Sequence, residues 1–267
     1  MNKRMVACIS LLVSLMLACG IASKTGSPTG NATGTTPQKQ PGGIFSRPTA
    51  TADPVPVSIN DGLGSLNSYV MSVQFNSSGP DPSQSSTTTM EVQRSHDNDA
   101  SETHLNISSV PKGGGDPKTT EDYIYKIGND QCSGSGSDWT WTSLTPTQAE
   151  MTGVLKSMLG LTPMIDSPSF VAQETVNDIP TNHFTFKVTG LGDTSGAVVN
   201  INQGDYWLAV DGQYIVKYTL VLETSDPNNT DVFHEEISID LTQINQPVDI
   251  AFPQGCLKIQ PTPTPTP

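Results

Sequence analysis

Few side chains in this 267-residue sequence are arranged for acid–base or nucleophilic chemistry. None of its four histidines belongs to the zinc-binding motif H-E-x-x-H, and no serine stands in the nucleophile motif G-x-S-x-G. Ser109–Lys112 and Lys24–Gly26 match the motifs S-x-x-K and K-T-G, but their order along the chain is the reverse of that in penicillin-recognising enzymes. We therefore expect no catalytic residues, and we do not expect an enzyme.

One acidic segment begins like a calcium-binding loop. Asp97–Ser101 places oxygen-bearing side chains at alternate positions, but Glu102 occupies the position that requires glycine, and Ser108 replaces the bidentate glutamate. We interpret the segment as a solvated hairpin turn. The sequence thus indicates no metal site, and no cofactor is expected.

The other polar and aromatic candidates also have structural interpretations. His183 lies in a β-rich run and is interpreted as a hydrogen-bonded strand residue, and Glu235–Glu236 is interpreted as an exposed edge. Trp139 and Trp141 stand two positions apart, so they form either a sugar-binding platform or a packed aromatic pair.

The first 18 residues predict a secretory signal peptide. Lys3 and Arg4 precede an apolar run, Met5–Ala18, that is too short to cross a bilayer as a stable helix. The segment Leu15-Met-Leu-Ala-Cys19-Gly resembles the bacterial lipobox, in which the cysteine receives acyl chains and becomes the N-terminus. We expect lipidation of Cys19 and an extracytoplasmic protein held at the cell membrane. The alternative is an ordinary secreted protein cleaved near Ala22.

The segment that begins at this cysteine is polar and low in complexity. Residues 19–57 are rich in Thr, Pro and Gly without a hydrophobic period, which predicts a disordered tether, and residues 258–267 form a Pro/Thr tail. Removal of residues 1–18 leaves 11 basic and 26 acidic side chains, a net charge of −15. Such a chain is repelled by phosphate backbones, so nucleic acid is an unexpected partner, and attachment depends on the lipid.

Two cysteines remain in the exported part of the chain. Cys8 leaves with the signal peptide and Cys19 is the acylation site, so Cys132 and Cys256 are an even pair in an exported domain, which favours a disulfide. A metal site is the rival interpretation, but neither cysteine has a neighbouring histidine.

Residues 58–257 predict one α+β domain that is mainly β. Turn clusters separate ten β-rich runs, and the hairpin across Asp211-Gly212 suits a two-residue type I′ turn. Capping and apolar spacing predict a helix over Thr145–Gly160, and a weaker pattern predicts a second over Ser58–Asn67. The runs are Tyr69–Ser78, Thr87–Ser95, Glu102–Val110, Glu121–Ile127, Asp138–Thr142, Phe170–Val176, His183–Thr189, Tyr206–Val210, Gln213–Thr224 and Asp231–Leu241.

Alternation gives several of these strands one wholly apolar face. Along Gln213–Thr224 every second residue from Tyr214 to Leu222 is aliphatic or aromatic, and Phe184 and Phe186 alternate with polar residues in the same way. Such faces either line a common concavity or pack against the Met151–Leu159 stripe of the expected helix as a closed core.

Two segments resemble LolA/LppX/LprG-type envelope lipoproteins. Glu174-Thr-Val-Asn-Asp-Ile-Pro-Thr-Asn-His183-Phe is similar to their "E-x-V-x-G-x-x-T-x-H-Y" hairpin, and Tyr206-Trp-Leu-Ala-Val-Asp-Gly-Gln-Tyr-Ile-Val-Lys217 is similar to their "W-x-D … L-V-x-K" hairpin. Asp178 occupies the position where this family usually has glycine, and Phe184 occupies the position where it commonly has tyrosine.

The resemblance implies a curved antiparallel half-barrel sheet with one or two helices covering its concave face, around an apolar cavity for lipid chains. The expected function is the binding of a lipid or other lipophilic small molecule by a monomeric, membrane-anchored lipoprotein that carries it in the cell envelope. The alternative is a sensor or interaction module on the same scaffold, like RseB-type regulators. The expected lining residues are Tyr214, Val216, Tyr218, Leu220, Met158, Phe184 and Phe186.

Overall fold

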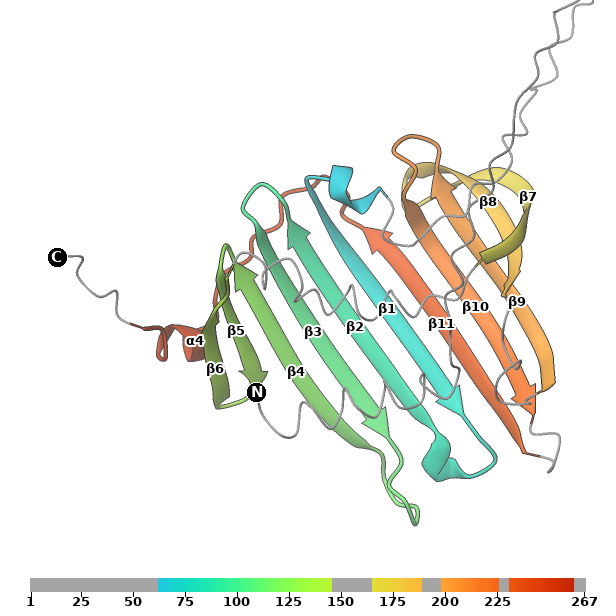
Figure 1. Cartoon of the computed structure of the whole chain (residues 1–267), viewed down its shortest axis with the longest axis horizontal. Helices are drawn as coiled ribbons and strands as arrows, with labels where there is room; N and C mark the ends of the chain where they lie inside the picture. The colour runs from blue at the N-terminus through green and yellow to red at the C-terminus, as the bar shows by residue number, and fades with distance from the viewer. Residues whose placement is uncertain (1–61, 146–164, 189–197, 226–230, 262–267) are drawn as a thin grey trace, which may run out of the picture. The chain divides into compact units, whose positions relative to one another are not determined.

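Eleven antiparallel strands form one sheet in the described part of the chain. The structure is a computed structural model and describes residues 62–145, 165–188, 198–225 and 231–261. The strand order is β6-β5-β4-β3-β2-β1-β11-β10-β9-β8-β7. The sheet is curved, and its edge strands β6 and β7 do not pair with each other (Figure 1).

Nearly all of the described secondary-structure elements are strands, which are six to twelve residues long. They are β1 (Ser68–Ser78), β2 (Ser86–Ser95), β3 (Ala100–Ser109), β4 (Lys118–Ile127), β5 (Asp130–Ser135), β6 (Asp138–Ser143), β7 (Ile165–Val176), β8 (Ile179–Val188), β9 (Val198–Ala209), β10 (Ile215–Ser225) and β11 (Val232–Thr242). The described helical turns are η1 (Leu63–Ser65), η2 (Pro82–Gln84) and α4 (Gln254–Leu257).

The first and last strands lie together at the middle of the sheet. Hairpins lead outward from β1 to β6 on one side, and the chain returns through β7 to β11 on the other, until β11 pairs with β1 (Figure 1). Within each half of the sheet, strands that follow one another in sequence lie side by side and antiparallel, as short connections favour. In the described sheet, the pairing of β1 with β11 alone joins the two halves.

The expected mainly β architecture is confirmed, but one strand was missed. The sequence predicted no strand over Asp130–Ser135, yet this segment forms β5 between β4 and β6. Its glycine allows the pairing, because a Cβ at Gly134 would lie 2.0 Å from the carbonyl oxygen of Asp138. Glycine and serine have low strand propensity, so their run hid a strand that depends on its neighbours.

The predicted type I′ turn across Asp211-Gly212 is wrong. β9 and β10 are joined by a longer loop closed by a bond from the Ala209 N–H to the Tyr214 carbonyl (2.9 Å), with positive φ at Gly212 (91°) and Gln213 (52°). A two-residue turn with two positive φ angles instead joins β7 to β8 at Asn177 (51°) and Asp178 (63°).

The two predicted helices are not seen as covering helices among the described residues. Thr145–Gly160 lies outside them except for Thr145, and residues 58–61 of the second prediction also lie outside. Its described part, from Gly62, contains only the single 3₁₀ turn Leu63–Ser65. In the described ranges, no helix is long and apolar enough to cross a membrane.

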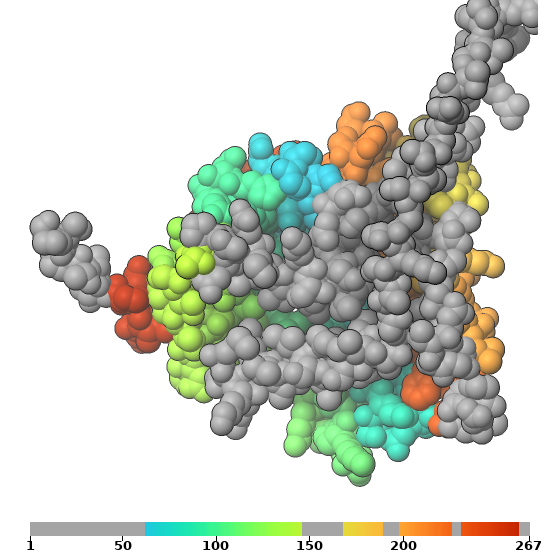
Figure 2. Space-filling model, viewed as in Figure 1, coloured from blue at the N-terminus to red at the C-terminus, as the bar shows by residue number. Residues whose placement is uncertain are grey.

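A disulfide attaches the end of the chain to one edge of the sheet. The predicted Cys132–Cys256 bond is confirmed, with Cα atoms 5.9 Å apart, and both cysteines are fully buried. It joins β5 to α4, which lies against the β5–β6 edge (Figures 1 and 2). A Cβ at Gly255 would lie 2.3 Å from the Trp139 indole nitrogen, so α4 fits closely over that ring.

Loss of this disulfide should destabilise the fold strongly. It closes a loop of 124 positions, which corresponds to about 4–5 kcal/mol in the chain-entropy model. We expect the Cys132→Ala/Cys256→Ala double variant to unfold at much lower denaturant concentration, as measured by circular dichroism. A midpoint equal to that of the oxidised protein would contradict the expectation.

Candidate functional site

One row of apolar side chains crosses most of the sheet at a single register position. Each member is the direct cross-strand partner of the next, and such partners share a face. We call it the apolar row, and we call the face that carries it the apolar face. Seven steps of about 4.8 Å between neighbouring strands give it a length of about 34 Å. Its members, from β7 to β3, are Phe170, Phe184, Tyr206, Tyr218, Ile239, Val73, Met90 and Leu105.

The β7–β10 end of the apolar row is aromatic. Ring centroids lie 5.7 Å apart for Phe170 and Phe184, and 5.0 Å apart for Phe184 and Tyr206. Phe186 packs against both tyrosines, at 5.8 Å from Tyr206 and 5.4 Å from Tyr218. Exposure falls from 54% at Phe170 to zero at Tyr218. This end of the row therefore leads from solvent to the buried interior of the fold.

A glycine on β9 makes room for the aromatic packing. Gly204 lies between Phe186 on β8 and Leu220 on β10 in the register. A Cβ at this position would lie 2.2 Å from Cζ of Phe186, so the ring occupies the space above the glycine backbone.

The structure brings together the described members of the predicted lining set. Val216, Tyr218 and Leu220 have no exposed surface, and Tyr214 and Phe186 are nearly as buried in the same cluster. Phe184 packs against that cluster, whereas Met158 lies outside the described residues. Sequence periodicity pointed to these positions. Burial fits both a lined cavity and a closed core, so the lining role stays a prediction.

One polar atom on the apolar face is buried without a hydrogen bond. The hydroxyl of Tyr218 has no hydrogen-bond partner in the described part of the chain, and its surroundings are apolar. Burial raises the pKa of Tyr218, so the hydroxyl stays protonated and can donate. A buried hydroxyl without a partner costs about 1–3 kcal/mol.

The opposite face, which we call the polar face, carries a histidine held between two carboxylates. Nδ1 of His183 lies 2.9 Å from Oε1 of Glu174, and Nε2 lies 3.0 Å from Oδ1 of Asp205. Trp207 stacks on His183 and donates from its indole nitrogen to Glu174 (2.6 Å), and Lys217 lies over the indole at 5.3 Å. The prediction that His183 is a hydrogen-bonded strand residue is confirmed, and this network joins β7, β8, β9 and β10.

The tryptophans at the other end of the polar face are packed against neighbouring side chains. Trp141 lies against Phe252 with centroids 4.6 Å apart, and Trp139 lies near Tyr125 (6.2 Å) in the cluster around the disulfide. Of the two alternatives, the packed aromatic pair therefore agrees with the structure. The segment at Asp97 forms the β2–β3 turn, where Asp99 pairs with Arg94 and Lys126.

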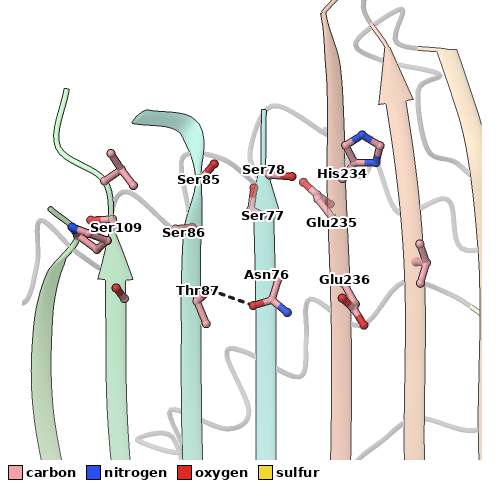
Figure 3. Close-up of a pocket in the computed structure, with 14 residues that line it drawn as sticks. Asn76, Ser77, Ser78, Ser85, Ser86, Thr87, Ser109, His234, Glu235 and Glu236 are labelled. Atoms are coloured by element: carbon pink, nitrogen blue, oxygen red, sulfur yellow. Dashed lines mark hydrogen bonds between the residues drawn. The ribbon is translucent and has the colours of Figure 1, made fainter. Parts of the chain in front are cut away.

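A pocket of about 430 Å³ lies between the ends of β1 and β3 and the starts of β2 and β11. Figure 3 shows His234, Glu235 and Glu236 on β11 near Asn76 and the serines of β1. The prediction of an exposed edge at Glu235–Glu236 is wrong, because β11 is a central strand and Glu235 is half-buried beside Ser77. None of the expected lining residues lines this pocket.

Most of the residues around this pocket carry hydroxyl, amide or carboxyl groups, and Val110, Pro117 and Val221 lie beside them. The described lining contains neither Lys nor Arg. Burial raises the pKa of Glu235. Over the described residues, no group of three or more His, Cys, Asp or Glu side chains is placed to hold a metal ion.

Two solved structures match this chain at low similarity. That of the Mycobacterium tuberculosis lipoprotein LppX matches 71% of this chain and 92% of its own, at 13% identity and a TM-score of 0.33. LprF from Mycobacterium bovis matches 73% of this chain and 94% of its own, at 13% identity and a TM-score of 0.37. No family model matches the sequence, and no curated protein matches it.

Identities of 13% and TM-scores below 0.5 transfer no ligand and no activity to this chain.

Replacement of Glu235 should reveal the cost of its burial. Its pKa is raised above the ordinary value of 4.5, so the buried carboxylate destabilises the folded state at neutral pH. Glu235→Gln should raise Tm at pH 7, and the gain should vanish as the pH falls below 4.5, where the carboxyl is protonated in both states. Differential scanning calorimetry from pH 7 to below pH 4.5 measures this difference in Tm. The exposed neighbour supplies the control, Glu236→Gln, and equal gains for both variants would contradict the assignment.

Proposed function

We propose that this protein is a membrane-anchored lipoprotein that binds a lipid or another hydrophobic ligand on the apolar face of its sheet. The observation that carries the proposal is the apolar row, which begins at exposed Phe170 and continues through fully buried Tyr218. A ligand with a long hydrocarbon chain could bury its length along such a row, starting from an end that solvent reaches.

Hydrocarbon burial alone can supply the affinity. At about 0.8 kcal/mol for each buried CH₂ group, a sixteen-carbon chain gains roughly 12 kcal/mol on leaving water. Part of this gain offsets the lost freedom of the ligand, and the surplus sets the affinity. Binding of this kind needs an apolar surface of suitable length and few specific polar groups, which agrees with the lack of catalytic motifs in the sequence.

A sensor or interaction module is the second candidate. It is favoured by two adjacent apolar residues on edge strand β7, Phe170 and Val171, which are 54% and 51% exposed. Exposed apolar side chains on a sheet edge are a typical contact surface for another protein. A closed core and a protein partner would favour this candidate, whereas copurified lipid favours the first.

The binding proposal is tested by the mass of the purified protein. We expect native mass spectrometry of the full chain, extracted from membranes in mild detergent, to show a bound lipid in addition to the acyl anchor. Phe184→Ala removes a central ring of the aromatic end and should lower the lipid occupancy, because the ligand loses contact with that ring. A loss of about 1.4 kcal/mol of binding free energy would lower the affinity about tenfold.

A matched variant on the other face controls for lost stability. Phe252→Ala removes a partly buried ring from the cluster around the disulfide, so it should leave the lipid occupancy unchanged. An unliganded protein, or equal losses in both variants, would count against the proposal and would favour the interaction module.

Membrane anchoring is proposed to depend on Cys19 alone. The mature chain carries a net charge of −15, so its surface offers no attraction to anionic lipid. We expect Cys19→Ala to move the protein from the membrane fraction to the soluble fraction and to abolish labelling by radioactive palmitate. Continued membrane association of this variant would show that another segment holds the protein there.

A further inference from the structure

We propose that the Tyr218 hydroxyl is a hydrogen-bond donor to the carbonyl oxygen at the head of a bound acyl chain. The inference rests on the proposed function and deepens it, because it makes the ligand an oxygen-bearing acyl lipid rather than any hydrocarbon. Tyr218 then positions the polar head of the ligand, while the apolar row accommodates the chain.

The Tyr218 hydroxyl lacks a hydrogen-bond partner among the described residues. Buried side-chain hydroxyls are nearly always hydrogen-bonded, and a buried tyrosine usually directs its O–H to a partner. Tyr218 has no exposed surface, and its hydroxyl has no such partner within the described ranges. Phenylalanine would provide the same ring without an unpaired polar group, as it does at Phe186 on the same face. The hydroxyl is therefore a feature that packing alone does not explain.

Tyr218 stands where the aromatic and aliphatic parts of the apolar row meet. Its direct neighbours are Tyr206 on β9 and Ile239 on β11, so aromatic side chains continue on one side and aliphatic ones on the other. If the ligand oxygen lies at Tyr218, the hydrocarbon chain can extend along either the aromatic arm of the row, which starts at Tyr206, or the aliphatic arm, which starts at Ile239. The aromatic arm leads to the exposed ring of Phe170, which gives the ligand an entry from the sheet edge.

The protonation state of Tyr218 limits the chemistry of its partner. Burial raises the pKa of Tyr218, so the side chain remains a neutral phenol that donates its proton. A neutral donor in apolar surroundings is best matched by an oxygen acceptor that is itself inexpensive to desolvate. An ester carbonyl meets this condition, and a free carboxylate offers the same acceptor geometry at a greater desolvation cost.

The test compares three ligands of equal chain length on the full chain. The chain carries Cys19→Ala, so that its own acyl groups do not compete for the site. The probes are hexadecane, hexadecanoic acid and its methyl ester, and each displaces a fluorescent acyl reporter. For Tyr218→Phe we expect about a tenfold loss of affinity for an oxygen-bearing probe and no loss for hexadecane.

Stability and a control variant separate this role from a structural one. Without ligand, Tyr218→Phe should unfold at the same or higher denaturant concentration, because it removes an unpaired buried hydroxyl. Tyr125→Phe makes the same chemical change on the polar face, where the hydroxyl donates to Glu102 (3.0 Å), and should leave all three affinities unchanged.

Each outcome decides the inference. A loss for the ester alone identifies a carbonyl acceptor, and a loss for the acid alone identifies a carboxylate; both support the donor role. Equal effects on hexadecane and the ester, or no effect on any probe, overturn the role of Tyr218 while leaving hydrophobic binding intact. Failure of all probes to bind the parent chain overturns both this inference and the proposed function.

Discussion

In-register pairing of antiparallel strands is the constraint on which the site depends. Side chains alternate between faces along a strand, so a slip of one residue would move a whole apolar set to the other face. The register keeps Phe184, Tyr206 and Tyr218 in line, and the pairing of β11 with β1 extends that line to Val73. Without that central pairing, Val73, Met90 and Leu105 would belong to a separate sheet from the rest of the apolar row.

The two faces of the sheet stabilise it in different ways. On the polar face, His183 and its carboxylate partners join the β7–β8 hairpin to β9, and the Cys132–Cys256 bond secures the opposite end. These directional contacts leave the apolar face to nonpolar packing, in which shape and area matter more than specific partners. Such a division would suit the proposed function, in which the sheet is held firmly while one face binds a hydrocarbon chain.

A polar group in apolar surroundings provides specificity that hydrocarbon burial cannot. The free energy of burying a hydrocarbon chain is roughly proportional to the buried area, so it discriminates weakly between lipids of similar length. The Tyr218 hydroxyl, as the proposed donor, would penalise a ligand that leaves it unpaired and would so select for a particular head chemistry. The lipid anchor proposed at Cys19 would keep this selection close to the membrane from which a ligand comes.

Local sequence determined most of the strands, the mainly β class and the cysteine pair. Residue alternation and the number of cysteines do not depend on which strands pair with one another. The errors of prediction from sequence were also local: glycine and serine concealed β5, and Asp211-Gly212 suggested a turn that the structure forms at Asn177–Asp178. Tertiary structure alone decided that β11 lies beside β1, that Glu235 is half-buried, and that Tyr206 lines up with Tyr218. These facts depend on pairing between segments far apart in the chain, and no local pattern encodes that register.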